Sequence, residues 1–306
     1  MRSILRQTFT DWELVVVAQG DEAEMRAVVE ATAAGDERVR FVYLPTLGVS
    51  TGRNAALAEA VGEIVAFIDD DCEADADWLV ELDRCFDADI GLVSGSLIAP
   101  PKVGWWYASC PSIDVDDVLY DPAIDGAQAA ENFGLLGANM AIRRSDVGKT
   151  GGYDECLGSG SAFDGGEEHD LVFRMAEAGV RMRSSPKVVV RHTYGWRYGL
   201  RAVWKVKRDR FRGNGAIAAK GLLAEKPEGG LRVRTVVIDH ARAQLTTMGL
   251  RRLPFGFFRQ FFYLPSYRKC LRNYALGLPQ GKGMAYGVLV PRTDADRSRT
   301  SPIVVT

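Results

Sequence analysis

The sequence predicts an α/β fold in which a mostly parallel sheet is flanked by helices. The first 190 residues alternate short β-branched runs with segments of helical periodicity, the order expected of parallel strands joined by helices. The chain of 306 residues is 47% hydrophobic and 25% charged, which is typical of a folded domain and excludes a disordered or collagen-like chain. Ligands of such sheets bind at the carboxyl ends of the strands, so functional residues are expected there.

Six short runs are expected to form strands, because they are apolar or rich in β-branched residues. They are residues 13–17, 39–43, 64–68, 90–94, 137–142 and 187–191. Four segments between them are expected to form helices, namely residues 21–33, 50–60, 75–86 and 167–178. The last segment places Leu171, Met175 and Ala178 at the i, i+4, i+7 spacing of a buried helical stripe.

The net charge of −2 hides an asymmetry along the chain. Residues 1–190 hold 15 Lys and Arg against 34 Asp and Glu, whereas residues 191–306 hold 23 against 6. A basic segment of this size suggests an anionic partner or the acidic half of the same molecule. We therefore predict an α/β domain over residues 1–195 and a helical, basic extension with a loose tail over residues 196–306.

The sequence gives no sign of a leader peptide or a membrane anchor. Residues 1–6 lack the apolar segment of a signal peptide, and no run reaches the ~18 apolar residues of a membrane span. The five cysteines are odd in number and form no CxxC pair, which argues against a disulfide framework or a zinc ribbon. These observations favour a cytoplasmic protein.

Three consecutive aspartates follow the apolar run at residues 64–68. Asp69, Asp70 and Asp71 stand where a parallel sheet places its ligand site. Adjacent carboxylates repel one another unless a cation lies between them, and Mg²⁺ or Mn²⁺ is commonly held by one or two carboxylates plus substrate phosphates. A metal-bound diphosphate therefore fits this position. The alternative is a solvated loop that leads into an acidic first helical turn.

Five motifs, taken in order, resemble those of family 2 glycosyltransferases. They are residues 48–57 (GVSTGRNAAL), 67–71 (FIDDD), 137–144 (GANMAIRR), 151–155 (GGYDE) and 166–171 (GEEHDL), the last followed by Arg174. The similarity covers roughly residues 3–195. It implies a GT-A fold, a nucleotide-diphosphate sugar donor, a hydroxyl acceptor on a saccharide or a lipid-linked molecule, and inverting transfer that depends on Mn²⁺ or Mg²⁺. Envelope polysaccharide synthesis is a common setting for this family.

The resemblance also assigns a donor and metal site. By match to the D-x-D motif, Asp71 is the direct metal ligand, Asp69 contacts the ribose or metal-bound water, and Asp70 need not point inward. His192 matches a histidine that completes the metal shell in some relatives, and a structural role is the alternative. Arg53 is expected at the donor phosphates, unless it pairs with a nearby acid. The donor-binding candidates are Gly48, Arg53, Asn54, Asp69, Asp70 and Asn139.

The same resemblance indicates a catalytic base. The family's usual Glu-Asp pair corresponds to Glu167 and Glu168, in the first turn of the predicted helix 167–178. The second residue of the pair takes the acceptor proton, so Glu168 is the expected base and Glu167 the competing candidate. Carboxylates in a first helical turn also need no function, because they complement unpaired N–H groups and the helix dipole.

Two departures from the family affect the donor site. The first residues correspond to the end of the family's first helix, so the first strand is absent from this sequence and we expect unpaired strand edges. We expect either a longer natural chain or a fragment with impaired donor binding. Ala18 and Gln19 stand where relatives often carry two aspartates, so the sequence does not indicate which nucleotide the donor contains. A non-catalytic or impaired nucleotide-sugar-binding protein is therefore the alternative function.

Aromatic residues are interleaved with Lys and Arg through residues 196–274. One interpretation is a helical appendage that packs its aromatic face on the sheet domain. Another is a helix that lies on an anionic membrane, which places the protein peripherally on the inner face of the cell membrane. No nucleic-acid-reading motif accompanies the charge, so nucleic acid is not an expected partner.

Overall fold

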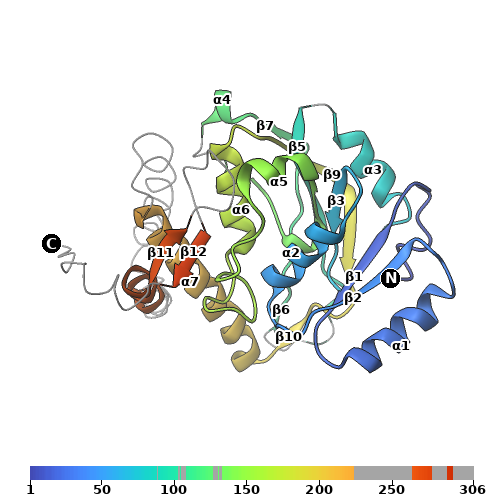
Figure 1. The fold of residues 1–306 in the computed structure, drawn as a ribbon, viewed down its shortest axis with the longest axis horizontal. Coiled ribbons are helices and arrows are strands. Elements are labelled where there is room, and N and C mark those ends of the chain that lie inside the picture. Colours follow the sequence, from blue (N-terminus) through green and yellow to red (C-terminus); the bar gives the residue numbers. More distant parts are fainter. Residues whose placement is uncertain are drawn as a thin grey trace.

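The computed structural model describes residues 1–87, 89–102, 104, 108–126, 130, 133–223, 264–277 and 288–291. Helices flank a central sheet, which confirms the predicted α/β class (Figure 1). Residues 224–263, a large part of the predicted aromatic and basic segment, lie outside the described residues.

Every predicted strand and helix is present, most of them with shifted ends, and there are several additional elements. The strands are β1 (Leu14–Ala18), β2 (Val39–Tyr43), β3 (Ile64–Phe67), β4 (Cys72–Ala74), β5 (Ile90–Ile98), β6 (Ala108–Ser109), β7 (Val118–Tyr120), β8 (Met140–Arg143), β9 (Arg181–His192), β10 (Arg197–Tyr198), β11 (Tyr274–Gly277) and β12 (Val288–Pro291). The helices are α1 (Glu22–Ala33), α2 (Val49–Glu59), α3 (Trp78–Cys85), α4 (Pro122–Asp125), the 3₁₀ turn η2 (Gly137–Asn139), α5 (Arg144–Thr150), α6 (Glu167–Glu177) and α7 (Leu200–Leu223).

The main sheet is mixed, which corrects the predicted predominance of parallel pairing. Its strand order is β3–β8–β5–β9–β4, and β7 also pairs with β9. β5 and β9 run parallel, but β8 is antiparallel to both β3 and β5, and β4 is antiparallel to β9. Met140, Ala141 and Ile142 of β8 are fully buried. Continuous burial makes an antiparallel interior strand look like a parallel one in sequence.

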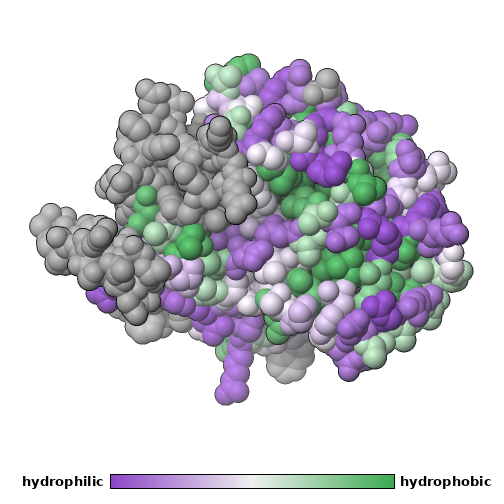
Figure 2. Space-filling view, viewed as in Figure 1, coloured by the Kyte–Doolittle hydropathy of each residue, from purple (hydrophilic) through white to green (hydrophobic). Residues whose placement is uncertain are grey.

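β1 and β2 form a separate parallel pair. Within the described residues β1 pairs only with β2 and β3 only with β8, so each has an edge without a strand partner there. The apolar residues 14–17 of β1 are accordingly only half-buried. Apolar side chains reach the surface in this part of the molecule (Figure 2).

Two apolar clusters enclose the sheet. Alternate residues of β8 divide between them, because successive strand side chains point to opposite faces. Met140 and Ile142 belong to the cluster that contains Leu171 of α6, whereas Ala141 belongs to the cluster that contains Trp78 of α3. The sheet is therefore covered on both faces, and its strand ends are the places where polar side chains can gather.

A buried lysine attaches the C-terminal elements to this domain. Lys220 of α7 donates to Asp154 Oδ2 at 2.7 Å and to Asp170 Oδ1 at 2.5 Å, and all three side chains are buried. Asp154 also accepts a hydrogen bond from Leu289 N of β12 at 2.8 Å. Gly213 of α7 packs closely against the loop that precedes α6. A Cβ added to Gly213 would lie only 2.3 Å from a backbone oxygen of that loop. α7 therefore supports the beginning of α6 directly.

None of the helices in the described ranges has the length and apolar character needed to cross a membrane.

Glu177, the last residue of α6, should make stability depend on pH. Neither carboxylate oxygen has a hydrogen-bond partner in the described ranges, and burial raises the pKa of this side chain from 4.5 to about 7. Between these values the folded chain holds more protons than the unfolded chain, so stability falls as pH rises from about 4.5 to 7. Thermal melts across this window should show a smaller fall for Glu177→Gln than for wild type; equal falls would contradict the assignment.

Candidate active site

The aspartate run lies at the end of a buried strand, as predicted. β3 ends at Phe67 and β4 begins at Cys72, so the three aspartates form the turn between them. Asp70 is exposed, the side chain of Asp69 is 41% exposed, and that of Asp71 is 28% exposed. The carboxylates are thus fixed by the sheet yet open to solvent, where a ligand can reach them.

Arg53 of α2 brings together acids from two distant segments. Its Nη2 lies 3.4 Å from Asp69 Oδ1, and its Nη1 lies 3.2 Å from Glu167 Oε1 and 4.0 Å from Glu168 Oε1. The guanidinium is buried beside the Tyr153 ring. Burial alone would lower the pKa of Arg53, but Tyr153 and the carboxylates raise it, so the side chain stays charged. The sequence left two roles open for Arg53, contact with the donor phosphates or pairing with nearby acids. The contacts present in the structure are those with acids.

The two glutamates that open α6 differ in protonation. Burial and repulsion from Glu168 raise the pKa of Glu167 to about 8. For Glu168, burial also acts to raise the pKa, but Arg53 and His169 outweigh it. Its Oε1 accepts a hydrogen bond from Gly137 N at 3.1 Å, and the net effect lowers the pKa of Glu168 from its ordinary value. Near neutral pH Glu168 is therefore ionised while Glu167 holds a proton.

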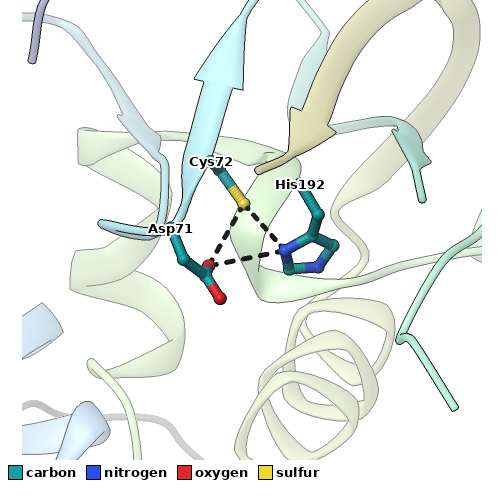
Figure 3. A group of neighbouring side chains, drawn as sticks. All are labelled: Asp71, Cys72 and His192. Carbon is teal, nitrogen blue, oxygen red and sulfur yellow. Dashed lines mark hydrogen bonds and ion pairs between the residues drawn. The ribbon is translucent and has the colours of Figure 1, made fainter. Parts of the chain in front are cut away.

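Asp71, Cys72 and His192 form a compact group of metal-ligating side chains (Figure 3). Asp71 Oδ1 lies 3.4 Å from His192 Nδ1, and Cys72 Sγ lies 3.5 Å from Asp71 Oδ1 and 3.4 Å from His192 Nδ1. Carboxylate, imidazole and thiolate are all ligands of divalent metals, so the residues fit an ion. Asp69, also expected at the metal, instead contacts Arg53 and lies outside this group. Cys72 was not expected here, although its place directly after the D-x-D motif is a usable signal.

Asn139 makes structural hydrogen bonds, which corrects its expected role at the donor. The side chain is fully buried, and its Nδ2 donates to Ser96 O at 2.8 Å and to Val188 O at 2.9 Å. Its Oδ1 accepts from Trp78 Nε1 at 2.9 Å. The amide therefore ties β5, β9 and α3 together, with both of its N–H groups used and the side chain closed off from solvent.

Asn54 and Gly48 fix the position of α2. Asn54 Oδ1 accepts from Tyr153 N at 2.7 Å, and its Nδ2 donates to Tyr153 O at 2.9 Å. Gly48 has φ 138°, a conformation that favours glycine, and both its N–H and its carbonyl bond to the Gln19 amide. Gln19, a departure from the expected motif, therefore holds the helix that carries Arg53.

Comparisons with known proteins indicate the family and the fold. The profile described as Glycosyl transferase family 2 matches residues 1–151. This matched part of the chain belongs to the family. Glucosyl-dolichyl phosphate glucuronosyltransferase of Haloferax volcanii is 28% identical over 163 residues, which are 52% of this chain and 51% of that protein. Pre-mycofactocin glycosyltransferase of Mycobacterium tuberculosis is 28% identical over 152 residues, 48% of this chain and 30% of that protein. This family 2 chain spans about half the length of the first relative and less of the second.

Solved structures of glycosyltransferases share the fold. The mannosyltransferase PcManGT from Pyrobaculum calidifontis, in complex with GDP-Man and Mn²⁺, superposes with a TM-score of 0.55 at 18% identity, over 87% of this chain and 80% of that one. S. aureus TarS 1–349 in complex with UDP-GlcNAc gives 0.56 at 14% identity, over 93% of both chains. The GT-A fold predicted from the sequence is confirmed.

Proposed function

We propose that this family 2 protein moves a sugar from a nucleotide-diphosphate donor to a hydroxyl group of a saccharide or lipid-linked acceptor, with inversion at the sugar carbon. The observation that supports this most directly is the meeting of Asp69, at the end of β3, with Glu167 and Glu168 around Arg53. A single displacement needs donor and base held side by side, and the contacts around Arg53 support such an arrangement.

Glu168 is the proposed catalytic base. It is ionised near neutral pH, and its side chain is 18% exposed against 7% for Glu167, so it can meet an acceptor hydroxyl. As the acceptor oxygen bonds to the anomeric carbon, Glu168 takes the hydroxyl proton. The bond to the nucleotide diphosphate breaks and the leaving group keeps its electron pair. Attack from the side opposite the leaving group inverts the sugar.

Asp71 and His192 are the proposed ligands of a divalent ion, Mn²⁺ or Mg²⁺ by family resemblance. Bound there, the ion would supply positive charge for the departing diphosphate. The Pyrobaculum mannosyltransferase was solved with GDP-Man and Mn²⁺, which supports a divalent ion at this fold. Arg53 orients Asp69 toward the donor and keeps Glu168 ionised.

Four donor-binding candidates stay in the proposal with Asp69. Asp70 is exposed beside the proposed ion and is free to meet the nucleotide. Gly48 and Asn54 act by placing α2, and Arg53 by its charge next to the donor site.

We also propose peripheral contact with an anionic membrane at the start of the basic extension. Tyr194 is 82% exposed and Leu200 is 74% exposed, close in sequence to the exposed Arg201 and Lys205 of α7. Exposed apolar side chains beside cations favour the headgroup layer. The Haloferax relative is named for a dolichyl-linked molecule, and such an acceptor would lie at a membrane. The chain should co-sediment with anionic but not with neutral liposomes; no pelleting with either would remove this part of the proposal.

Donor turnover tests the proposed reaction. With MnCl₂ the full chain should release nucleoside diphosphate from at least one of the UDP-, GDP- and dTDP-sugars, faster when an acceptor saccharide is added. EDTA should stop the release. A folded chain that turns over none of these donors would contradict the proposal and favour a binding protein.

Gly137 should be needed for the geometry around Glu168. A Cβ at Gly137 would lie 2.5 Å from Nη2 of Arg53 and 2.7 Å from Oε1 of Glu168, closer than atoms approach without a bond. Both are ends of side chains that can move, so Gly137→Ala should shift them at little cost in stability. A displacement of this kind lowers the turnover rate by up to about 10²-fold.

Gly148→Ala is the matched control, because an added Cβ in this helical position of α5 meets nothing within 4 Å. Its rate should equal that of wild type. A wild-type rate in Gly137→Ala would show that the contact between Gly137 and Glu168 does not matter for the reaction.

A further inference from the structure

Cys72 lies within the proposed metal site and offers a ligand that Mn²⁺ and Mg²⁺ do not favour. Its Sγ completes a triangle with Asp71 Oδ1 and His192 Nδ1 whose sides are 3.4–3.5 Å (Figure 3). We propose that the Cys72 thiolate is the third protein ligand, and that the site binds a thiophilic divalent ion of the zinc class more tightly than Mg²⁺ or Mn²⁺. The inference rests on the proposed function for the place of the ion and changes the identity of that ion.

The spacing of the three atoms suits one shared ion. In the plane of a triangle with these sides, the point equally distant from the three atoms lies about 2.0 Å from each, and points just above the plane lie slightly farther. An ion just above the plane would therefore be near the 2.0–2.3 Å of zinc bonds to nitrogen, oxygen and sulfur. An ion could therefore be bound with small movements of the three side chains.

The backbone holds these side chains in place without an ion. Cys72 and His192 are direct partners in the ladder between β4 and β9. The carbonyl of Asp71 accepts hydrogen bonds from both the N–H and the hydroxyl of Thr193, each at 2.8 Å. All three ligands therefore stand on paired backbone, which is the arrangement that gives a metal site precise geometry.

The proposed metal site is buried on one side and faces solvent on the other. Cys72 is 5% exposed and His192 6% exposed, whereas the Asp71 side chain is 28% exposed. An ion bound on its buried side by sulfur and nitrogen would keep a solvent-accessible coordination position near Asp71. Zinc sites that act in catalysis use three protein ligands and leave the fourth position for water or substrate, and a donor phosphate would fit there.

The chemistry of the ligands favours zinc-class ions. Thiolate is a soft ligand that selects zinc over the harder ions, whereas Mg²⁺ and Mn²⁺ prefer carboxylate, carbonyl and water oxygens. When the ion binds, a sulfur–metal bond replaces the thiol S–H bond and the proton is released to solvent. Replacing Cys72 by Ser removes the sulfur and leaves Asp71 and His192, the set expected for Mn²⁺.

Cobalt spectroscopy tests this inference without a sugar donor. The full chain, stripped of metal with EDTA, is titrated with Co²⁺. A thiolate-to-cobalt charge-transfer band in the near ultraviolet is expected to saturate at one equivalent and to be removed by Zn²⁺ but not by excess Mg²⁺. Cys72→Ser should lose the band and weaken Co²⁺ binding by more than the about 10–100-fold typical of an outer-shell change. Cys156→Ser, a half-buried cysteine outside the site, should keep it.

A wild-type chain without the band, or a band that persists in Cys72→Ser, would overturn the inference. These results are distinguishable from failure of the proposed function. Donor turnover with Mn²⁺ but no cobalt band leaves the glycosyltransferase proposal standing and removes the thiolate ligand. A Cys72-dependent band in a chain that turns over no donor with any divalent ion keeps the thiolate ligand and removes the glycosyltransferase proposal.

Discussion

Replacing Glu168 by Gln is expected to lower the rate of sugar transfer by about 10²–10⁴-fold, the usual contribution of a positioned base. The amide keeps the size of the side chain and can still accept the hydrogen bond from Gly137 N, but it cannot take a proton. The donor should bind as tightly as before, since the change affects the acceptor step. Single-turnover rates and donor affinity, measured on the same preparation, separate the two effects.

Glu167→Gln is the matched control on the neighbouring residue. Because the pKa of Glu167 is raised to about 8, this side chain is mostly protonated at neutral pH, and glutamine resembles that form closely. We expect less than about a tenfold loss of rate, well below the loss in Glu168→Gln. A larger loss in Glu167→Gln would transfer the role of base to Glu167.

Replacing Lys220 by Met is expected to destabilise the protein by about 3–5 kcal/mol. Among the described contacts, the change removes the only ion-pair partner of Asp154, which is buried, and one of the two partners of Asp170, which keeps Arg174. Uncompensated charge, and not lost packing, is the reason for the large effect. For a chain of this size the melting temperature should fall by roughly 10 °C.

Lys205→Met is the control on the same helix. Lys205 pairs with Asp209 at 3.0 Å, but its side chain is 68% exposed, and an exposed pair of this kind contributes at most about 1 kcal/mol. The melting temperature of this variant should stay within a few degrees of wild type. Equal losses in the two variants would show that the buried network does not attach α7 to the domain.

Strand and helix positions could be predicted from the sequence because their signals are local. β2 has the predicted ends, residues 39–43, and α2 and α6 begin within one residue of the predicted starts. Strand direction could not be predicted, since it depends on how the chain re-enters the sheet. The residues of β8 look the same in either direction.

The candidate site could be predicted only in part, for the same physical reason. The motifs placed Asp71 and His192 at strand ends, and in the structure Asp71 Oδ1 lies 3.4 Å from His192 Nδ1. The motifs could not show that Arg53 bridges Asp69 to the start of α6, because that contact joins residues far apart in the chain. Asn139 was expected at the donor, yet its side chain is fully buried and its amide is hydrogen-bonded to β5, β9 and α3.

Titration calorimetry with nucleoside diphosphates tests the central claim most directly. The claim is that Asp71, beside the acids gathered at Arg53, helps bind the diphosphate of a nucleotide sugar through a divalent ion. We expect at least one of UDP, GDP and dTDP to bind the full chain only when a divalent ion is present. Asp71→Asn should lose about tenfold or more in affinity, whereas Asp11→Asn, an exposed acid before β1, should bind as wild type does. Binding that is unchanged by EDTA and by Asp71→Asn, or no binding of any of the three nucleotides, would contradict the account.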